Sequence, residues 1–588
     1  MDEKPRHPAG LMPLFFTEMW ERFGYYLMLG ILPLYLSDKE KGGIGWSDAD
    51  AAVVVGSYIA LVYLTPFVGG LLADRLLGFR KTIVIGAALM MTGYFLLAIP
   101  TVWGLYLALG TIIIGNGAFK PNISTLLGRL YPAGSPLKDA GYNIFYMGIN
   151  VGAFVCNFAA AFVRNYFDAH PDYGIKGWNA AFCTAGVGMF CGLMIFLSVY
   201  RRFASNDLDT STQQGPKESL NPLWFECVIP AAVLAGIGWL LADRKIIEFF
   251  NAPTAAFLGA CVPVVVFFIR MWLGQRDPDE RRRVAALLVV YIVIVVFFMS
   301  FHLNTTALNF WARDDTHREP NAAVRLVTDQ FDEFAEDAPP KYFDNAGAEV
   351  PRPAKDSFIV VDADRYKELT KANKLWDIRD SGTGQKKVYV HVTQEMLDKI
   401  FARTGPETRT LPEGQPLKLV NTELYQSINP AFVVLFTPLV VGFFALLRPK
   451  GLEPTTPAKI GLGLLINAGA PMMMYLATFA SGNSLNKVSS WWLFGTYAVT
   501  TVGELCLSPM GLSLVSKVSP PKITAFMMGG FFLAISIGNK LSGIFGEAYT
   551  TMDHYKFWTI LAVCNLAFGA SVFVILGWLK RQMGSALH

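Results

Sequence analysis

The sequence predicts an all-α polytopic membrane protein with a small α/β insertion on one side of the membrane. Of its 588 residues, 53% are apolar and only 16% are charged, and the mean hydropathy is +0.37. This composition is too apolar for a soluble chain of such length. Segments of about 20 apolar residues, long enough to cross a bilayer, recur along the chain except between residues 312 and 423.

Fourteen apolar segments are expected to cross the membrane. They form two groups of six, with two further segments between the groups. The expected segments are 13–36, 50–74, 79–99, 102–128, 141–166, 178–200, 224–242, 253–273, 283–311, 424–447, 457–480, 490–516, 521–546 and 556–580.

An even number of crossings places both termini on the same side of the membrane. Basic residues gather in the short loops on that side, for example Lys81, Arg129 and Arg202. The positive-inside rule assigns this side to the cytoplasm. We therefore expect a multi-pass protein of the cell (inner) membrane with two cytoplasmic termini.

This pattern divides the chain into four parts. They are an N-terminal six-helix bundle (1–200), a linker with an additional transmembrane hairpin (201–280), a C-terminal six-helix bundle (281–311 and 424–588) and an extracytoplasmic insertion (312–423). Within the insertion, SFIVVDADRYKEL and VYVHVTQEMLDKI each predict a strand followed by a short amphipathic helix. These two stretches predict that the insertion is a small α/β domain, which could consist of two copies of one strand–helix unit. This domain could cap the outer vestibule, could bind an unknown partner, or could be an insertion that the fold tolerates and that has no function of its own.

The first apolar segment carries three ionisable residues, Glu18, Glu21 and Arg22, followed by Tyr25 and Tyr26. On a helix these five side chains share one face, within an arc of about 140°. Ionisable groups at membrane depth are costly unless they face protein or water, so they mark a functional site by default. The alternative is a structural ion pair that joins two helices.

The stretch FFTEMWERFGYYLML matches the motif E-x-x-E-R-F-x-Y-Y and thereby resembles the proton-dependent oligopeptide transporters, a branch of the major facilitator superfamily. The resemblance extends over the chain outside the insertion. It implies the major facilitator fold and proton-coupled uptake of di- and tripeptides by alternating access, with protons as the coupling ion and no other cofactor. The loop GGLLADRLLGFRKT resembles the superfamily's loop signature, with one extra residue, and gives Asp74 and Arg75 a gating role.

The resemblance implies a substrate site shared between the two bundles. Lys120 follows the family pattern in segment four, and Asn150 lies in YNIFYMGINVG, which resembles F-Y-x-x-I-N-x-G. Two cations, Arg22 and Lys120, would attract a peptide carboxylate, and Glu504 would pair with the peptide ammonium. The substrate-binding residues so implied are Arg22, Tyr25, Tyr26, Tyr63, Lys120, Asn150, Asn429, Glu504 and Phe531, the last of which stands where the family usually has a tryptophan.

Three of these residues also have a plainer interpretation. Lys120 could extend its side chain to the membrane interface. Asn150 could bond between helices, as polar residues in membranes do. Glu504 could form a structural salt bridge with Lys540.

Segment seven departs from the family. VVFFMSFHLNTTALNFWAR aligns on F-E-Q-x-G-S-S-L-x-L-F-A with His302 at the acidic position, while the position of the partner arginine is Leu29. Both partners are missing together, which avoids an unpaired buried charge. His302, with Thr305, Thr306 and Asn309 on its expected helical face, is either a satisfied hydrogen-bonding residue or a pH-sensitive one. Glu18, Glu21, Arg22 and His302 are the candidate proton-coupling residues.

Two other functions compete with proton-coupled peptide uptake. One is a transporter of the same fold that carries another anionic or zwitterionic solute with altered or lost proton coupling. The other is a membrane sensor or docking protein that uses the external domain. An enzyme is not expected, because no metal spacing, nucleophile–base arrangement or phosphate-binding glycine loop occurs. The expected partners are a small peptide and the lipid bilayer, with no nucleic acid; peptide preference and oligomeric state stay open.

Overall fold

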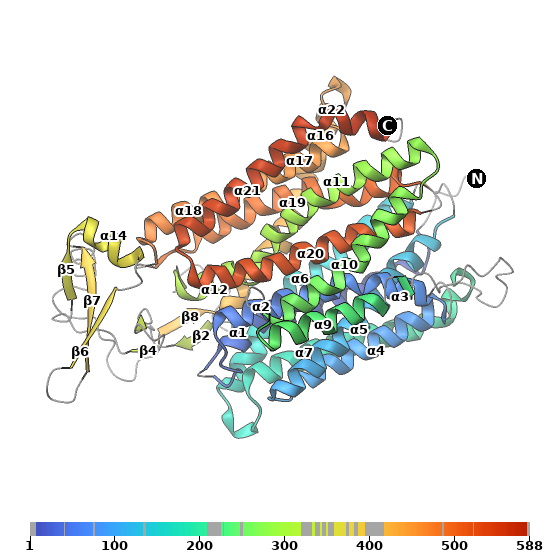
Figure 1. Ribbon diagram of the computed structural model, residues 1–588. Coiled ribbons are helices and arrows are strands. Elements are labelled where there is room, and N and C mark those ends of the chain that lie inside the picture. Colours follow the sequence, from blue (N-terminus) through green and yellow to red (C-terminus); the bar gives the residue numbers. More distant parts are fainter. Residues whose placement is uncertain are drawn as a thin grey trace.

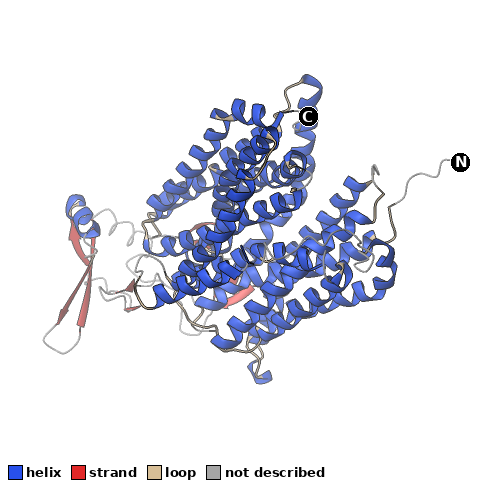
Figure 2. Ribbon diagram, turned by 45° about the vertical axis from the view of Figure 1, so that its right-hand side comes forward, coloured by secondary structure: helices blue, strands red, loops and turns tan. Residues whose placement is uncertain are grey.

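Helices dominate the computed structural model, and they form two bundles (Figure 1). The bundles come together at the end that carries the strands and diverge toward the end where both termini lie (Figures 1 and 2). The structure describes residues 7–39, 41–73, 77–132, 137–207, 225–226, 229–246, 251–318, 332–335, 342–343, 349–350, 358–371, 375–380, 386–393, 417–484, 487–520 and 523–584.

The N-terminal bundle covers the first six expected segments. Its second segment forms two helices, because the helix is interrupted at Thr65, just before Pro66. Proline disfavours a continuous helix at this point. The helices are α1 (Leu11–Ser37), α2 (Asp48–Leu64), α3 (Pro66–Leu72), α4 (Phe79–Leu96), α5 (Val102–Arg129), α6 (Lys138–Asp168) and α7 (Gly177–Val199). Two short 3₁₀ helices accompany them, η2 (Pro171–Tyr173) between α6 and α7 and η3 (Tyr200–Asn206) after α7.

Glycines on α6 let it lie close to α1. A Cβ on Gly152 would collide with the carbonyl oxygen of Met19, and one on Gly148 would come within 3.0 Å of the Phe15 ring. This pair of small residues four apart therefore packs two membrane helices together.

Two further helices, α9 (Ile229–Asp243) and α10 (Ala252–Leu273), form the hairpin between the bundles. Apolar side chains of α10 pack against α2 and against a helix of the C-terminal bundle, α20 (Thr524–Thr551). The cluster contains Phe257, Cys261 and Phe268 of α10, with Ala60 of α2 and Leu533 of α20. The hairpin thus covers the line along which the two bundles meet.

The C-terminal bundle contains the remaining segments. Its helices are α11 (Pro278–Phe301), η5 (His302–Thr305), α12 (Ala307–Asp314), η7 (Thr422–Ser427), α16 (Ile428–Leu447), η8 (Arg448–Lys450), α17 (Thr456–Asn467), α18 (Gly469–Ser481), α19 (Trp491–Val518), α20, α21 (His554–Val574) and α22 (Leu576–Met583).

The expectation of one continuous helical face in segment seven is wrong. The α-helix ends at Phe301, and a 3₁₀ turn follows from His302 to Thr305. Within this turn the Thr305 hydroxyl donates to the His302 carbonyl, 2.8 Å away. Asn309 lies beyond the turn and donates instead to the Gly30 carbonyl of α1, at 3.1 Å.

The described parts of residues 312–423 contain short strands and one helix. Strand β5 (Phe358–Val361) runs directly into α14 (Ala363–Lys371), as SFIVVDADRYKEL predicts. β7 (Lys386–Thr393) lies between β5, to which it is parallel, and β6 (Trp376–Asp380), to which it is antiparallel. The helix predicted after β7 lies outside the described residues, so the two-copy hypothesis stays a prediction.

The other strands form two-stranded pairs near the bundle ends. β1 (Thr316–His317) pairs in parallel with β9 (Val488–Ser489), which precedes α19. The remaining pairs are β2 (Asp332–Ala335) with β8 (Leu417–Val420), and β3 (Tyr342–Phe343) with β4 (Glu349–Val350), both antiparallel.

In the described residues, 11 helices are long and apolar enough to cross a membrane. α1 is not among them, since it carries the charged residues Glu18, Glu21 and Arg22. The 15-residue α9 is shorter than the others. A multi-pass protein is thus shown, while fourteen crossings stay a prediction.

Candidate functional site

The three charged residues of α1 form one buried cluster. Glu18, Glu21 and Arg22 are each at most 3% exposed. Arg22 Nε lies 3.1 Å from Glu18 Oε1 and also contacts Glu21 Oε2. The shared helical face predicted from the sequence therefore exists, and the cluster neutralises most of its own charge within one helix.

One member of this cluster was not predicted. Asn116 on α5 donates from Nδ2 to Glu21 Oε1 at 3.2 Å and is itself fully buried. The sequence did hold a signal for it, because Asn116 precedes Lys120 by four residues and so shares its helical face. The bond ties the α1 carboxylates to α5.

Lys120 also belongs to α5, but its ammonium contacts an aromatic ring. Lys120 Nζ lies 3.9 Å from the ring centroid of Tyr63 on α2, a distance at which the ring's electron-rich face attracts a cation. Lys120 has Glu18, Glu21 and Arg22 as charged neighbours. It therefore lies beside the α1 cluster, as the resemblance implies, and not at the membrane interface.

His302 lies beside the same tyrosine. The ring centroids of Tyr63 and His302 are 6.1 Å apart, and His302 Nδ1 lies 3.3 Å from the carbonyl oxygen of Phe298. Tyr63 of α2 thus has both Lys120 of α5 and His302 of η5, in the opposite bundle, as neighbours.

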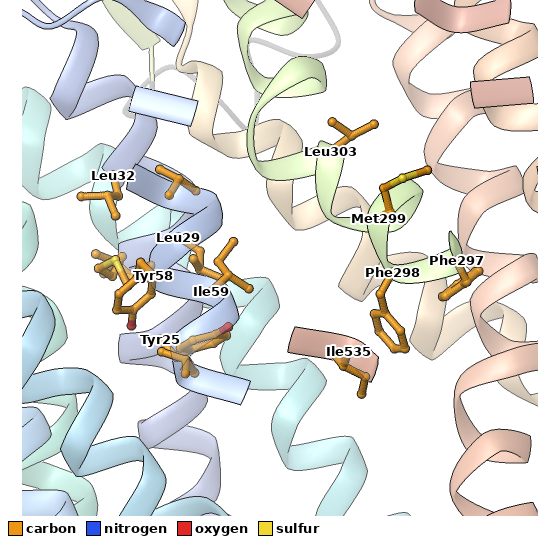
Figure 3. Packing of buried hydrophobic residues seen from close by; sticks show 14 of the residues in the cluster. Tyr25, Leu29, Leu32, Tyr58, Ile59, Phe297, Phe298, Met299, Leu303 and Ile535 are labelled. Atoms are coloured by element: carbon orange, nitrogen blue, oxygen red, sulfur yellow. The ribbon is translucent and has the colours of Figure 1, made fainter. Parts of the chain in front are cut away.

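Leu29 is buried in an apolar environment, with 4% of its surface exposed. In Figure 3 it lies beside Ile59 of α2, and Leu303 and Met299 line the facing helix. Leu29 therefore has apolar neighbours and no ion partner in the described residues, while the position aligned with the acid is the buried His302.

The tyrosines of α1 differ in their surroundings. Tyr25 is 1% exposed, and its ring centroid lies 5.1 Å from Cζ of Arg22. Tyr26 is only partly buried and has Glu504 of α19 as an electrostatic neighbour. Tyr26 therefore faces the opposite bundle.

In the C-terminal bundle, Asn429 and Glu504 are hydrogen-bonded to each other. Asn429 Nδ2 donates to Glu504 Oε2 at 3.0 Å and to the Thr501 hydroxyl at 2.9 Å. Both Asn429 and Glu504 are only partly buried. The alternative of a salt bridge between Glu504 and Lys540 is wrong, because the Lys540 ammonium donates instead to Ser57 Oγ at 2.7 Å.

Two predicted substrate contacts are engaged elsewhere. Asn150 donates to the carbonyl of Tyr146 on its own helix at 3.0 Å, so it does not bond between helices. Phe531 is 2% exposed and packs against Gly511 of α19 and into the apolar core. Contact of either side chain with a solute stays a prediction.

The gating pair Asp74 and Arg75 lies outside the described residues. In the adjoining part of this loop, Asp207 Oδ1 accepts from the backbone N–H of Phe79 at 2.7 Å, and Asp207 Oδ2 accepts from Arg80 Nε at 2.6 Å. Asp207 therefore caps the N-terminus of α4, a contact that the sequence did not indicate.

Polar contacts join the two bundles at the end where they converge. Arg164 Nε of α6 lies 3.4 Å from Glu423 Oε1 of η7, and both residues are almost fully buried. Arg313 of α12 contacts Asp48 of α2 at 2.7 Å. These contacts hold the bundles together at one end, while the bundles are spread at the other end (Figures 1 and 2).

At the end where the bundles converge, outside the membrane-spanning segments, the carboxyl group of Asp315 has a shifted pKa. Burial raises the pKa of Asp315 to about 7, although its carboxyl bonds to Ser484 and Tyr549. Ser484 Oγ in turn lies 2.9 Å from Nδ1 of His554. A hydrogen-bonded chain therefore connects the end of α12 with the start of α21. No cluster of metal-ligating side chains occurs in the described residues.

Comparison with known proteins identifies relatives that agree with one another in family and in name. A model of the POT family matches residues 80–335 and 418–558. A di-/tripeptide transporter of Lactococcus lactis subsp. cremoris is 27% identical over 98% of this chain and 97% of its own length. The peptide transporter YePEPT of Yersinia enterocolitica is 26% identical over 97% of this chain and 94% of its own. Among solved structures, a peptide transporter POT in complex with sulfate superposes with a TM-score of 0.71, at 25% identity over 98% of this chain and 96% of its own.

Proposed function

Because this chain belongs to the POT family, we propose that it couples proton entry to the uptake of di- and tripeptides by alternating access. The names of its relatives support this substrate class, since two of them are a di-/tripeptide transporter and a peptide transporter. The chain is a membrane transporter and not an enzyme. Protons are proposed as its coupling ion.

One observation carries the proposal. Lys120 on the N-terminal bundle and Glu504 on the C-terminal bundle carry opposite charges, and both side chains are only partly buried. Tyr26 of α1 has both Arg22 and Glu504 as electrostatic neighbours, so the cationic cluster and Glu504 lie near each other across the two bundles. A zwitterion that spans them binds both bundles at once. Binding that favours a state in which both bundles contact the solute is what drives alternating access.

We assign the peptide carboxylate to the cationic side and the peptide ammonium to the acidic side. Arg22 is already engaged by Glu18 and Glu21, so Lys120 is the stronger carboxylate contact. Asn429 already donates to Glu504 and would orient this carboxylate toward the ammonium. Tyr26 and Tyr63 would line the space between the two charged ends, while Tyr25, Asn150 and Phe531 would shape it.

Glu18 and Glu21 are the proposed proton-carrying groups, with Arg22 as their shared partner. Protonation of one carboxyl would weaken its hold on Arg22 and so free the guanidinium for the substrate. His302 is proposed to sense the same protonation through Tyr63 and Lys120, since the Tyr63 ring neighbours both side chains.

The remaining assignments concern placement in the cell. We propose a cell (inner) membrane location with both termini cytoplasmic and residues 312–423 on the outer side. Asp74 and Arg75 are proposed to gate the inner side. The insertion is proposed to be dispensable for transport, with a partner for it as the alternative.

Uptake of labelled dialanine into proteoliposomes, with and without an inward proton gradient, tests the proposal. We expect accumulation above the external concentration only with the gradient. Exchange without accumulation would contradict the coupling but retain the solute class. Competition by a panel of dipeptides then separates peptide transport from transport of another zwitterion, which the changes at Leu29 and His302 make the second candidate. Deleting residues 320–415 tests the sensor alternative, since a transporter keeps its uptake.

A further inference from the structure

Lys540 lies at the seam where α2 of one bundle meets α20 of the other, and the proposed function gives it no role. It is 2% exposed. It lies 11 residues before the end of α20, which is roughly 16 Å of helix. This is too far for the side chain to reach the membrane surface. A lysine at such depth is a candidate functional residue by default.

The immediate partner of Lys540 is a neutral hydroxyl of the opposite bundle. Lys540 Nζ lies 2.7 Å from Ser57 Oγ. Ser57 donates its own proton to the carbonyl of Val53 at 2.6 Å. The serine oxygen can therefore only accept from Lys540, and this bond forms equally with an ammonium or with a neutral amine.

The seam around Lys540 contains further polar atoms without partners. Asn539, the preceding residue, is fully buried, and neither atom of its amide group has a hydrogen-bond partner. Next to it the backbones of the two bundles touch, since a Cβ on Gly56 would collide with Cα of Gly543. The bundles thus meet most closely beside a lysine and an amide that are incompletely satisfied.

The hairpin covers this seam. Leu533, Ile537, Lys540 and Glu547 share one face of α20 within about 80°. Leu533 and Ile537 pack into the apolar cluster formed with α10, and Glu547 lies 3.5 Å from Asn251, the residue that caps α10. Lys540 lies between these contacts, so α10 separates it from lipid.

The surrounding elements provide no close counterion. The titratable groups on the elements that pack together here are Glu547 and Tyr549 on α20, Asp48, Asp50, Tyr58 and Tyr63 on α2, Cys261 and Arg270 on α10, Asp279, Glu280, Arg281, Arg282, Arg283 and Tyr291 on α11, Tyr497, Glu504, Cys506 and Lys517 on α19, and His302 on η5. Lys540 forms no ion pair with any of them in the described chain. Glu547, two turns along the same helix, is the one carboxylate that acts on it electrostatically.

We infer that Lys540 is a proton-coupling residue of the transport cycle, held by Ser57 and shielded from lipid by the hairpin. Burying an unpaired ammonium in this seam costs much more free energy than burying a neutral amine that keeps its bond to Ser57. When the bundles part at the outer end, water reaches Lys540, and its amine binds one proton from the outer side. When the seam closes, that proton leaves to water on the inner side, which is then open. No other reactant is needed.

This inference rests on the proposed function and adds a proton site to the carboxylates of α1. It also explains how a chain with Leu29 and His302 in place of the usual charge pair can keep proton coupling at the outer half of the bundles. The lysine lies on α20, not on the helix that bears the missing acid.

The test compares Lys540→Gln with the wild type in proteoliposomes that contain a pH-sensitive dye. Glutamine keeps a donor for Ser57 but cannot carry the proton. We expect exchange of labelled dialanine without a gradient to remain within twofold of wild type. Gradient-driven accumulation should fall at least tenfold, and the number of protons entering per peptide should fall by one. Lys540→Arg, which cannot release its proton, should show the same pattern.

Lys459→Gln serves as the matched control. Lys459 is also a lysine in a spanning helix, but it pairs with Glu453 at 2.6 Å near the membrane surface, so its loss should leave the proton count unchanged. The inference is overturned if Lys540→Gln accumulates dialanine with the wild-type proton count, or if exchange and accumulation disappear together, which indicates a structural role. Failure of the wild type itself to accumulate dialanine would refute the proposed function as well.

Discussion

Arg164 on α6 and Glu423 on η7 form a buried ion pair that joins the two bundles. The Arg164 guanidinium also lies 4.4 Å from the ring centroid of Trp178. Its neighbour Asn165 exchanges amide hydrogen bonds with Asn421 at 3.0 and 3.1 Å. This contact between the bundles is therefore a polar network that includes a buried ion pair.

Replacement of Arg164 by alanine should be strongly destabilising. It leaves the Glu423 carboxylate buried without its cation, which typically costs about 3–5 kcal/mol. The midpoint of thermal unfolding in detergent measures the effect. Arg365→Ala is the control, because its pair with Glu368 is more than half exposed on both sides and such pairs contribute little. Equal midpoints for the two variants would contradict the prediction.

Replacement of Glu21 by glutamine should separate exchange from accumulation. Glutamine preserves the shape of the side chain but carries no proton, and Asn116 can still bond to its carbonyl oxygen. We expect dialanine to exchange down its gradient while proton-driven accumulation is lost. A variant that still concentrates dialanine against its gradient would show that Glu21 is not a coupling residue.

Replacement of Glu504 by glutamine should weaken the binding of substrates that have a free amino group at their N-terminus. Loss of a charge-assisted hydrogen bond typically costs about 2 kcal/mol, so KM for dialanine should rise roughly 30-fold. The measurement compares dialanine with its N-acetylated form in competition assays. If the replacement weakens the binding of dialanine and of its N-acetylated form to the same extent, Glu504 does not contact the ammonium.

Replacement of Gly543 by alanine should disturb the contact between the bundles. A Cβ there would lie 2.8 Å from Cα of Gly56, and overpacking of this kind costs about 1–3 kcal/mol. The unfolding midpoint should fall. Gly110→Ala on α5, where no atom lies within 4 Å of the added carbon, should be neutral or stabilising. A Gly543→Ala midpoint at or above wild type would refute the close approach.

Asp315 should make stability depend on pH. Burial raises its pKa to about 7, against an ordinary value near 3.9 in an unfolded chain. The folded state therefore binds the proton more tightly, and this contribution is complete below about pH 4 and is lost as the pH rises to about 7. Its size is on the order of 4 kcal/mol.

Thermal unfolding of wild type and Asp315→Asn between pH 5 and pH 8 checks this expectation. The wild-type midpoint should fall with rising pH, and the variant should show a flatter curve that lies above wild type at pH 8. Asp364→Asn, at a highly exposed position of α14, should follow wild type. Parallel curves for wild type and Asp315→Asn would contradict the prediction.

The sequence predicted the long helices and the shared face of the charged residues on α1 because both depend on local patterns. Hydrophobic length defined the spans, and helical spacing placed Glu18, Glu21 and Arg22 on one face. The pairing of Glu504 could not be predicted in this way, since distances between helices do not follow from spacing along the chain. Its partner is Asn429 and not Lys540.

The break at His302 was missed for a different reason. The stretch HLNTT contains neither proline nor glycine, the residues that usually announce the end of a helix. Contacts of Asn309 with α1 and of the neighbouring turn with α20 are tertiary, and they override the local helical preference.

The two ends of the insertion meet each other. The Val420 N–H donates to the Arg318 carbonyl at 2.9 Å, and Arg318 Nη1 donates to the Val420 carbonyl, also at 2.9 Å. Chain ends that already touch can be joined by a tight turn or by another folded module without stretching the scaffold. The position is therefore a natural grafting point, where a fluorescent reporter could replace the insertion and follow the movement of the bundles.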